Sequence, residues 1–252
     1  MSFRDRFQNL KETVGQWTDS TGGGSLDRKI ERNLAEMEGG TEIERTAAVK
    51  ALVIQAQIDD KWADPIITSF LRVLPSQLAS PQEAIIDGLL ELRKVKVSRE
   101  EEIFESIQET LDSPYPSVRS KVVDIWTRFS LKSDSKTSDT IAVLFEMLSD
   151  DDKDVRYQTQ ESLSKILHTV PKVALPELKN AIGDDDWRVT YHSIVLLTEF
   201  AKKYPDPSVA LAPEVIEAFN SGERLKERAA DCIGMLGVAN PKVVKPAVPG
   251  LI

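Results

Sequence analysis

Histidine, cysteine and clustered aspartate are the residues of this chain whose types could support catalysis or bind a metal. Neither His168 nor His192 is followed by a second ligand three or four positions later, which is the spacing that puts two ligands on one helix face. The aspartate triplets at 150–152 and 184–186 lack the alternating ligands and the later glutamate of a calcium loop. We therefore predict no metal site and no cofactor, and interpret both triplets as solvated caps of helices.

The remaining reactive group and the glycine-rich segment also have structural explanations. Cys232 is the only cysteine, so no internal disulfide forms and a reducing compartment is favoured. No basic neighbour at a suitable spacing would activate its thiol, which predicts a small buried residue. The three glycines at 22–24 are not followed by Lys-Ser/Thr, so they indicate a linker rather than a phosphate loop. We predict that the protein is not an enzyme.

Charge and hydropathy restrict the partners. The 252-residue chain has a formal net charge of −9. Nucleic acids and anionic membranes are bound mainly through lysine and arginine, so neither is a favoured partner. No apolar run approaches the roughly 18 residues of a membrane-spanning helix, and the first residues lack the apolar core of a secretory signal. We expect a cytoplasmic protein.

A repeat supplies the elements that would position any site. Anchor positions that are followed by small or apolar residues four and eight places later recur every 34 to 38 residues. The anchors are Val118, Val155, Val189 and Leu225, with fainter copies at Ile43 and Pro81. A period of this length predicts a solenoid of stacked helical units.

Each unit is predicted to contain helix A, a polar turn and helix B. In the clearest unit helix A covers 141–148, the turn covers 149–154 and helix B runs from Val155 to Leu167. Helical spacing places apolar residues of helix B on one buried stripe. Prolines are expected in the first turn of four A helices, where they are tolerated: Pro65, Pro176, Pro213 and Pro249.

An aspartate-rich turn followed by Val-Arg resembles the HEAT-repeat family of armadillo-like α-solenoids. Residues 151–156, Asp-Asp-Lys-Asp-Val-Arg, are the best match, and residues 184–189 are close to it. The resemblance implies an all-α, right-handed α–α superhelix. In that family turn aspartates and helix B arginines form a ladder between units. Arg119 and Arg156 fit that pattern, whereas Thr190 and Lys226 depart from it.

The predicted solenoid covers residues 25–252 and has about six helical hairpins. Its units are 25–59, 60–97, 98–133, 134–171, 172–205 and 206–239, followed by a partial unit at 240–252. The partial unit has an apolar face at Val243, Val244, Val248, Leu251 and Ile252. Either the chain is a fragment of a longer array, or this face docks on another molecule or on a second copy.

Residues 1–24 form a separate region, an amphipathic helix followed by the glycine-rich linker. Its apolar residues are spaced 4, 3, 4 and 3 apart, which predicts one helical seam: Phe3, Phe7, Leu10, Val14 and Trp17. This helix either caps the first repeat or docks on a partner.

The resemblance implies a scaffold or adaptor that binds proteins through its helix B surface, which lines the concave face in this family. The candidate partner-binding residues are Lys121, Asp124, Arg128, Tyr157, Gln158, Glu161, Lys165, Tyr191, His192, Val195 and Glu199, together with Phe3, Phe7, Leu10 and Trp17 of the N-terminal helix. Tyr157 and Tyr191 are the best candidate anchors, because aromatic residues supply large contact areas.

Two alternatives remain open. The connections between units are basic, so nucleic acid could bind along that edge. HEAT-like repeats also occur in DNA glycosylases that use aromatic residues and a carboxylate. Here Trp126, Tyr157, Trp187 and Tyr191 could supply the aromatic residues, and Asp124 or Glu161 the carboxylate. Such repeats also occur in bilin lyases, a class that the single Cys232 neither favours nor excludes. The second alternative is a structural role through self-assembly at the C-terminal helix.

Overall fold

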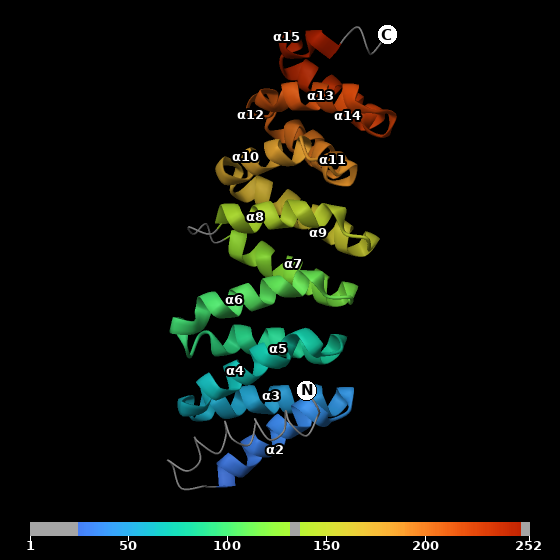
Figure 1. Ribbon diagram of the computed structural model, residues 1–252. Helices are drawn as coiled ribbons and strands as arrows, with labels where there is room; N and C mark the ends of the chain where they lie inside the picture. The colour runs from blue at the N-terminus through green and yellow to red at the C-terminus, as the bar shows by residue number, and fades with distance from the viewer. Residues whose placement is uncertain (1–24, 132–136, 248–252) are drawn as a thin grey trace. The chain divides into compact units, whose positions relative to one another are not determined.

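The structure, a computed structural model, describes residues 25–131 and 137–247 (Figure 1). These residues form helices, turns and short connections, with no β-strand among them. The all-α fold class predicted from the sequence is confirmed. No helix in the described ranges is long and apolar enough to span a bilayer.

The α-helices follow one another in pairs. They are α2 (Ser25–Gly39), α3 (Glu42–Ile58), α4 (Ala63–Val73), α5 (Ala79–Leu92), α6 (Glu100–Glu109), α7 (Pro116–Ser130), α8 (Thr137–Glu146), α9 (Lys153–Thr169), α10 (Pro171–Ile182), α11 (Trp187–Lys203), α12 (Pro205–Ser208), α13 (Ala212–Ser221), α14 (Glu223–Ala239) and α15 (Pro241–Val244). The 3-10 segments are Asp60–Trp62, Leu74–Ser76, Val97–Arg99, Thr110–Asp112, Met147–Ser149, Val209–Leu211 and Lys245–Ala247.

The chain divides into two compact units, Met1–Val118 and Arg119–Ile252. In the first unit, a capping box starts α3. Thr41 Oγ1 accepts from the Glu44 amide, and the Glu44 carboxylate accepts from the Thr41 amide at 2.8 Å. This reciprocal pairing satisfies amides that have no partner within the helix. The core contains fully buried aliphatic and aromatic side chains from successive helices: Ile30, Leu34, Leu52, Ile66, Phe70, Ile85 and Leu89.

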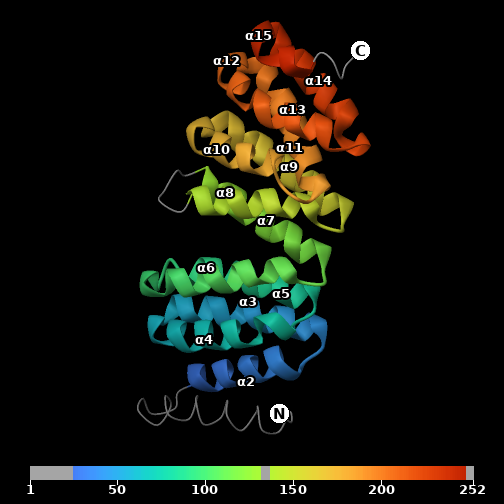
Figure 2. The same ribbon diagram turned by 45° about the horizontal axis from the view of Figure 1, so that its top comes forward.

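In the second unit the A helices α8, α10 and α13 contact one another in sequence, and so do the B helices α9, α11 and α14 (Figure 2). The two layers bury the predicted stripe of α9. Its members Val155, Thr159, Leu163, Ile166 and Leu167 are all buried. Helix α9 runs from Lys153 to Thr169, two residues beyond the predicted helix B (Val155 to Leu167) at each end, and stops directly before Val170 and Pro171.

The aspartate turns of this unit cap the B helices. Asp152 Oδ1 accepts from the amides of Asp154 and Val155 at 2.8 and 3.2 Å, and Asp186 Oδ1 accepts from the Arg188 amide at 2.8 Å. These carboxylates also complement the positive end of each helix dipole. The capping role predicted for both triplets is therefore confirmed for Asp152 and Asp186.

Two predictions about helix register were wrong. Pro176 lies inside α10 rather than in its first turn, because Pro171 already occupies the start of that helix. Pro65 and Pro213 do lie in the first turns of α4 and α13, and Pro249 lies outside the described residues. Ile43 is 82% exposed, whereas the anchors of the later B helices and Pro81 are buried.

The Ile43 discrepancy has a local cause. The capping box at Thr41 starts α3 at Glu42, so Ile43 falls on the solvent side of the first turn. The stripe that α3 buries is Ala48, Val49, Leu52 and Ala56. The expected stripe members Ala47 and Ala51 are exposed and half-buried.

Candidate protein-binding surface

The surface of interest is formed by outward side chains of the B helices in the second unit, here named the helix B surface. Its candidate residues are Lys121, Asp124 and Arg128 on α7, Tyr157, Gln158, Glu161 and Lys165 on α9, and Tyr191, His192, Val195 and Glu199 on α11. All of them are exposed or half-buried. The candidates Phe3, Phe7, Leu10 and Trp17 lie outside the described residues.

Hydrogen bonds between neighbouring B helices hold this surface together. Gln158 Nε2 on α9 donates to the Ser120 carbonyl on α7 at 3.2 Å. His192 Nδ1 on α11 lies 2.7 Å from Gln160 Oε1 on α9. These bonds fix the relative positions of three helices, so the exposed groups between them are presented on a preorganised support.

The two candidate anchor tyrosines differ in their surroundings. Tyr157 is 65% exposed, and its hydroxyl donates only a long hydrogen bond of 3.3 Å to Glu161. Tyr191 is half-buried and accepts a hydrogen bond of 3.1 Å from Arg228 Nε on α14. The Arg228 guanidinium also lies 5.9 Å from the centre of the Tyr191 ring. This hydrogen bond raises the pKa of Arg228. Of the two tyrosines, Tyr157 is thus the more accessible to a partner. Tyr191 instead holds the Arg228 guanidinium beside its ring and hydroxyl.

The surroundings of His192 on α11 alter its titration. Burial lowers the pKa of His192, and the positive charge of Arg156 lowers it further. The neutral imidazole is therefore the stable form near neutral pH, and its Nδ1–H tautomer can donate a hydrogen bond to Gln160 Oε1.

We expect this histidine to make folding sensitive to acid. A histidine in the unfolded chain titrates near pH 6.5, so the unfolded state takes up the proton before the folded state does. The free energy of unfolding should therefore fall as the pH drops below about 7. Urea unfolding at about pH 7.5 and about pH 5.5 should show a smaller difference for His192→Gln than for the natural chain. An equal difference in both proteins would contradict this, and His168→Gln is the matched control.

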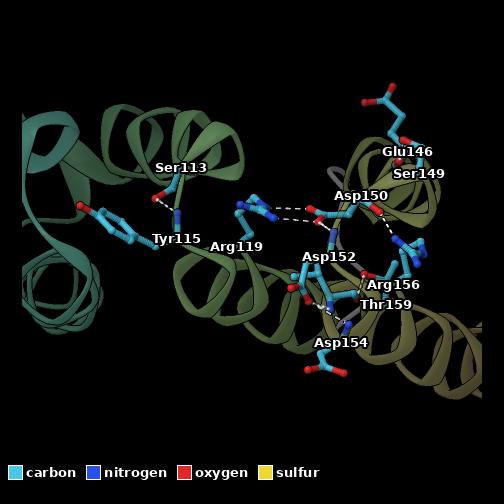
Figure 3. A network of polar contacts seen from close by, with 11 residues as sticks. Ser113, Tyr115, Arg119, Glu146, Ser149, Asp150, Asp152, Asp154, Arg156 and Thr159 are labelled. Atoms are coloured by element: carbon cyan, nitrogen blue, oxygen red, sulfur yellow. Dashed lines mark hydrogen bonds and ion pairs between the residues drawn. The ribbon is translucent and has the colours of Figure 1, made fainter.

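The family's ladder of turn aspartates and helix B arginines is represented here by one buried ion pair, Arg119–Asp150 (Figure 3). Arg119 Nε and Nη2 donate to the two carboxylate oxygens of Asp150 at 2.7 and 2.8 Å, with side chains only 12% and 5% exposed. Arg156 instead donates to the carbonyl of Asp150 in its own turn. At the equivalent position of the next helix, Thr190 Oγ1 donates to the Asp184 carbonyl at 3.0 Å.

The prediction that all three aspartates at 150–152 are solvated is therefore wrong for Asp150, whose side chain is buried. Its carboxylate pairs with Arg119 and also accepts from the Asp152 amide at 2.8 Å. The hydrogen bond to Asp150 raises the pKa of Arg119, outweighing the effect of burial. A buried bidentate pair of this kind orients α7 against the turn that starts α9.

The described side chains whose types could bind a metal, act as a nucleophile or stack on a base do not form a common site. Among the described residues no group of three or more His, Cys, Asp or Glu side chains could hold a metal. Burial raises the pKa of Cys232 to about 11, which disfavours the reactive thiolate. Trp126 is only 4% exposed and packs edge-on against Phe129, so it is not available to stack on a nucleobase.

A cavity of about 670 Å³ lies away from the helix B surface, between the α10–α11 turn and helices α13 and α14. Trp187 forms part of its lining, with the Arg188 and Arg224 guanidinium groups 5.7 and 5.1 Å from its ring centre. The sequence did not indicate this cavity. It depends on the packing of two turns that are distant in the sequence.

The comparisons with known proteins agree with this architecture. Residues 103–198 match the family model described as HEAT repeats. No curated protein matches the chain. Solved structures with the same fold include Kap121p bound to RanGTP, with a TM-score of 0.60 at 14% identity, covering 98% of this chain and 30% of that one. Kap121p bound to Nup53p gives 0.59 at 14%, with 94% and 29% covered.

A third structure, Kap95p with RanGDP, gives a TM-score of 0.55 at 16% identity, with 90% and 32% of the two chains covered. The chain thus spans about a third of the length of these proteins. Identities this low establish the fold and not the activity. The HEAT-type resemblance read from the sequence is confirmed: the chain is an α-solenoid that carries HEAT repeats at residues 103–198.

Proposed function

We propose that the protein is a non-catalytic scaffold or adaptor, acting in the cytoplasm, that binds a protein partner through the helix B surface. The observation that carries this proposal is the row of accessible groups on neighbouring B helices. Exposed Tyr157 on α9 is followed by the Tyr191–Arg228 pair of α11 and α14. Tyrosine and arginine are the residue types that most often dominate protein–protein interfaces.

The solved structures support the general class of function. Kap121p is described as bound to Nup53p and to RanGTP, and Kap95p as bound to RanGDP. These solenoids therefore bind proteins. The mixed charges of the helix B surface, which include Glu161, Lys165 and Glu199, favour a protein over a nucleic acid, whose phosphates need a basic surface.

The proposal predicts that removing both tyrosines weakens partner binding without unfolding the chain. Interface anchors each contribute more than about 1 kcal/mol, so Tyr157→Ala/Tyr191→Ala should reduce affinity at least tenfold, or about 1.4 kcal/mol. The partner is first identified by affinity capture on the full chain after nuclease treatment. Its affinity for each variant is then measured by titration calorimetry.

The matched control is Trp187→Ala, which removes a 41% exposed aromatic side chain from the turn region rather than from the helix B surface. We expect it to bind the partner normally. Full affinity of the double variant would show that the helix B surface is not the binding site. Capture that is abolished by nuclease would instead favour the nucleic-acid alternative, and concentration-dependent mass of the chain alone would favour self-assembly.

A further inference from the structure

The cavity beside Trp187 is a feature of the second unit that the helix B surface does not include. Its volume is about 670 Å³, which lies within the range of about 300–1,000 Å³ that is typical of small-molecule sites. Three elements line it, namely the turn between α10 and α11, helix α13 and the start of α14. The cavity therefore has the size of a ligand site and lies within one compact unit.

The charged groups in the cavity lining are mostly negative. Five carboxylates and one guanidinium line the cavity: Asp184, Asp185, Glu214, Glu217, Glu223 and Arg224. Lys179 Nζ lies 3.1 Å from Glu214 Oε1, and Lys226 pairs with Glu223, but neither lysine belongs to the lining. Asp185 and Glu217 are exposed and form no ion pair with a described residue. This excess of negative charge favours a cationic ligand.

One carboxylate oxygen of this lining is buried without a hydrogen bond. Glu214 Oε2 accepts no hydrogen bond from any described residue, although the atom is buried. The other oxygen, Oε1, is the one that faces Lys179, whose side chain is mostly exposed. A buried acceptor without a donor is unfavourable. A hydrogen-bond donor supplied by a ligand would therefore be stabilised at Glu214.

Apolar and aromatic side chains form another part of the lining. Ile182, Ala218 and Leu225 are buried at its base, and Trp187 is exposed. The Arg224 guanidinium lies 5.1 Å from the centre of the Trp187 ring, a distance at which an aromatic ring attracts a cation. The cavity can thus pack alkyl groups on its apolar side chains while its carboxylates and its indole ring attract positive charge.

The placement of the carboxylates distinguishes an organic cation from a metal ion. No three carboxylates in the described part of the chain are placed to hold one metal ion. Those of the cavity belong instead to three elements, with Asp185 in the turn, Glu217 on α13 and Glu223 at the start of α14. Separated negative charges with apolar side chains between them match a ligand whose positive charges are separated by alkyl groups.

We propose that the cavity beside Trp187 binds a linear aliphatic polyamine. Glu214 and Glu217 accept hydrogen bonds from one ammonium group, and the carboxylates of the turn attract another. The alkyl segment between the two ammonium groups packs on Trp187. This site is separate from the helix B surface, so polyamine binding does not depend on the protein partner proposed for that surface.

Calorimetric titration of the full chain with spermidine tests the proposal. We expect Glu214→Gln/Glu217→Gln to weaken spermidine binding about tenfold, because the ligand loses charge-assisted hydrogen bonds. The matched control is Glu105→Gln/Glu109→Gln, which removes the same charge from two exposed positions of α6 in the first unit and should bind spermidine as the natural chain does. No binding by the natural chain, or equal weakening in the two variants, would overturn the proposal, since equal weakening is the response to net charge alone.

The NMR signal of the Trp187 indole Nε1–H group tests where the ligand binds, and it requires no change to the carboxylates. This signal, assigned with Trp187→Phe, should shift when spermidine is added to the natural chain. Acetyl-lysine amide should bind about tenfold more weakly, because it offers a single ammonium group, and magnesium chloride should leave the signal in place. An unshifted signal with spermidine, equal affinity for acetyl-lysine amide, or an equal shift with magnesium chloride would show that the cavity does not recognise a polyamine.

Discussion

Replacing Arg119 by alanine is expected to destabilise the second unit by about 3–5 kcal/mol, the usual cost of leaving one member of a buried ion pair without its partner. Asp150 is only 5% exposed as a side chain, and Arg119 supplies both of its guanidinium contacts. Without Arg119 the carboxylate would remain buried beside the turn that starts α9, with the Asp152 amide as a remaining donor.

The measurement is chemical unfolding followed by circular dichroism, applied to a double-mutant cycle. Asp150→Ala should also destabilise strongly, and the double variant should cost less than the sum of the single losses, because neither buried charge remains unpaired. The matched control is Arg128→Ala. Arg128 pairs with Asp124 one turn away on α7, and its side chain is 70% exposed. Exposed pairs contribute about 0.2–1 kcal/mol. Equal losses for Arg119→Ala and Arg128→Ala would show that burial adds nothing to this pair.

Gly88→Ala is the second substitution with a large expected effect, and it should destabilise the first unit although alanine is the better helix former. A Cβ at residue 88 would lie 2.8 Å from a ring carbon of Phe70 and 2.8 Å from a methyl group of Val53. Phe70 is fully buried, so its ring has little space into which to move. Overpacking costs about 1–3 kcal/mol, which should exceed the gain of about 1 kcal/mol in helix propensity.

Gly234→Ala is the matched control for Gly88→Ala. It lies inside α14, where a Cβ would meet nothing within 4 Å. We therefore expect this variant to be stabilised by about 0.5–1 kcal/mol. Thermal and urea unfolding of the two variants should thus shift in opposite directions. A stabilised Gly88→Ala protein would mean that α5 can move away from α3 and α4 at no cost.

The repeat period predicted the helical pairs because each pair buries a stripe with helical spacing, and that spacing is visible in the sequence. Val155, Thr159 and Leu163 of α9 show this most clearly. The prediction was wrong at Ile43, where a capping box at Thr41 moved the buried stripe to Ala48, Val49 and Leu52. Similarly, Pro176 lies inside α10 because Pro171 already begins it. Local capping accompanied the changed register of α3, where the repeat was faint, and an earlier proline set the start of α10.

For the candidate surface, the sequence by itself determined which side chains leave the core, since positions between the buried stripes must face outward. Only the tertiary structure decided how they are supported. Gln160 beside His192, Arg228 on Tyr191 and Arg119 on Asp150 join residues 31 to 37 positions apart. The same holds for the cavity beside Trp187, which is formed by two separate turns. A helical pattern specifies which face of its own helix is buried. It does not specify which polar atoms of a neighbouring helix come within hydrogen-bonding distance, because that depends on the packing angle and offset between helices.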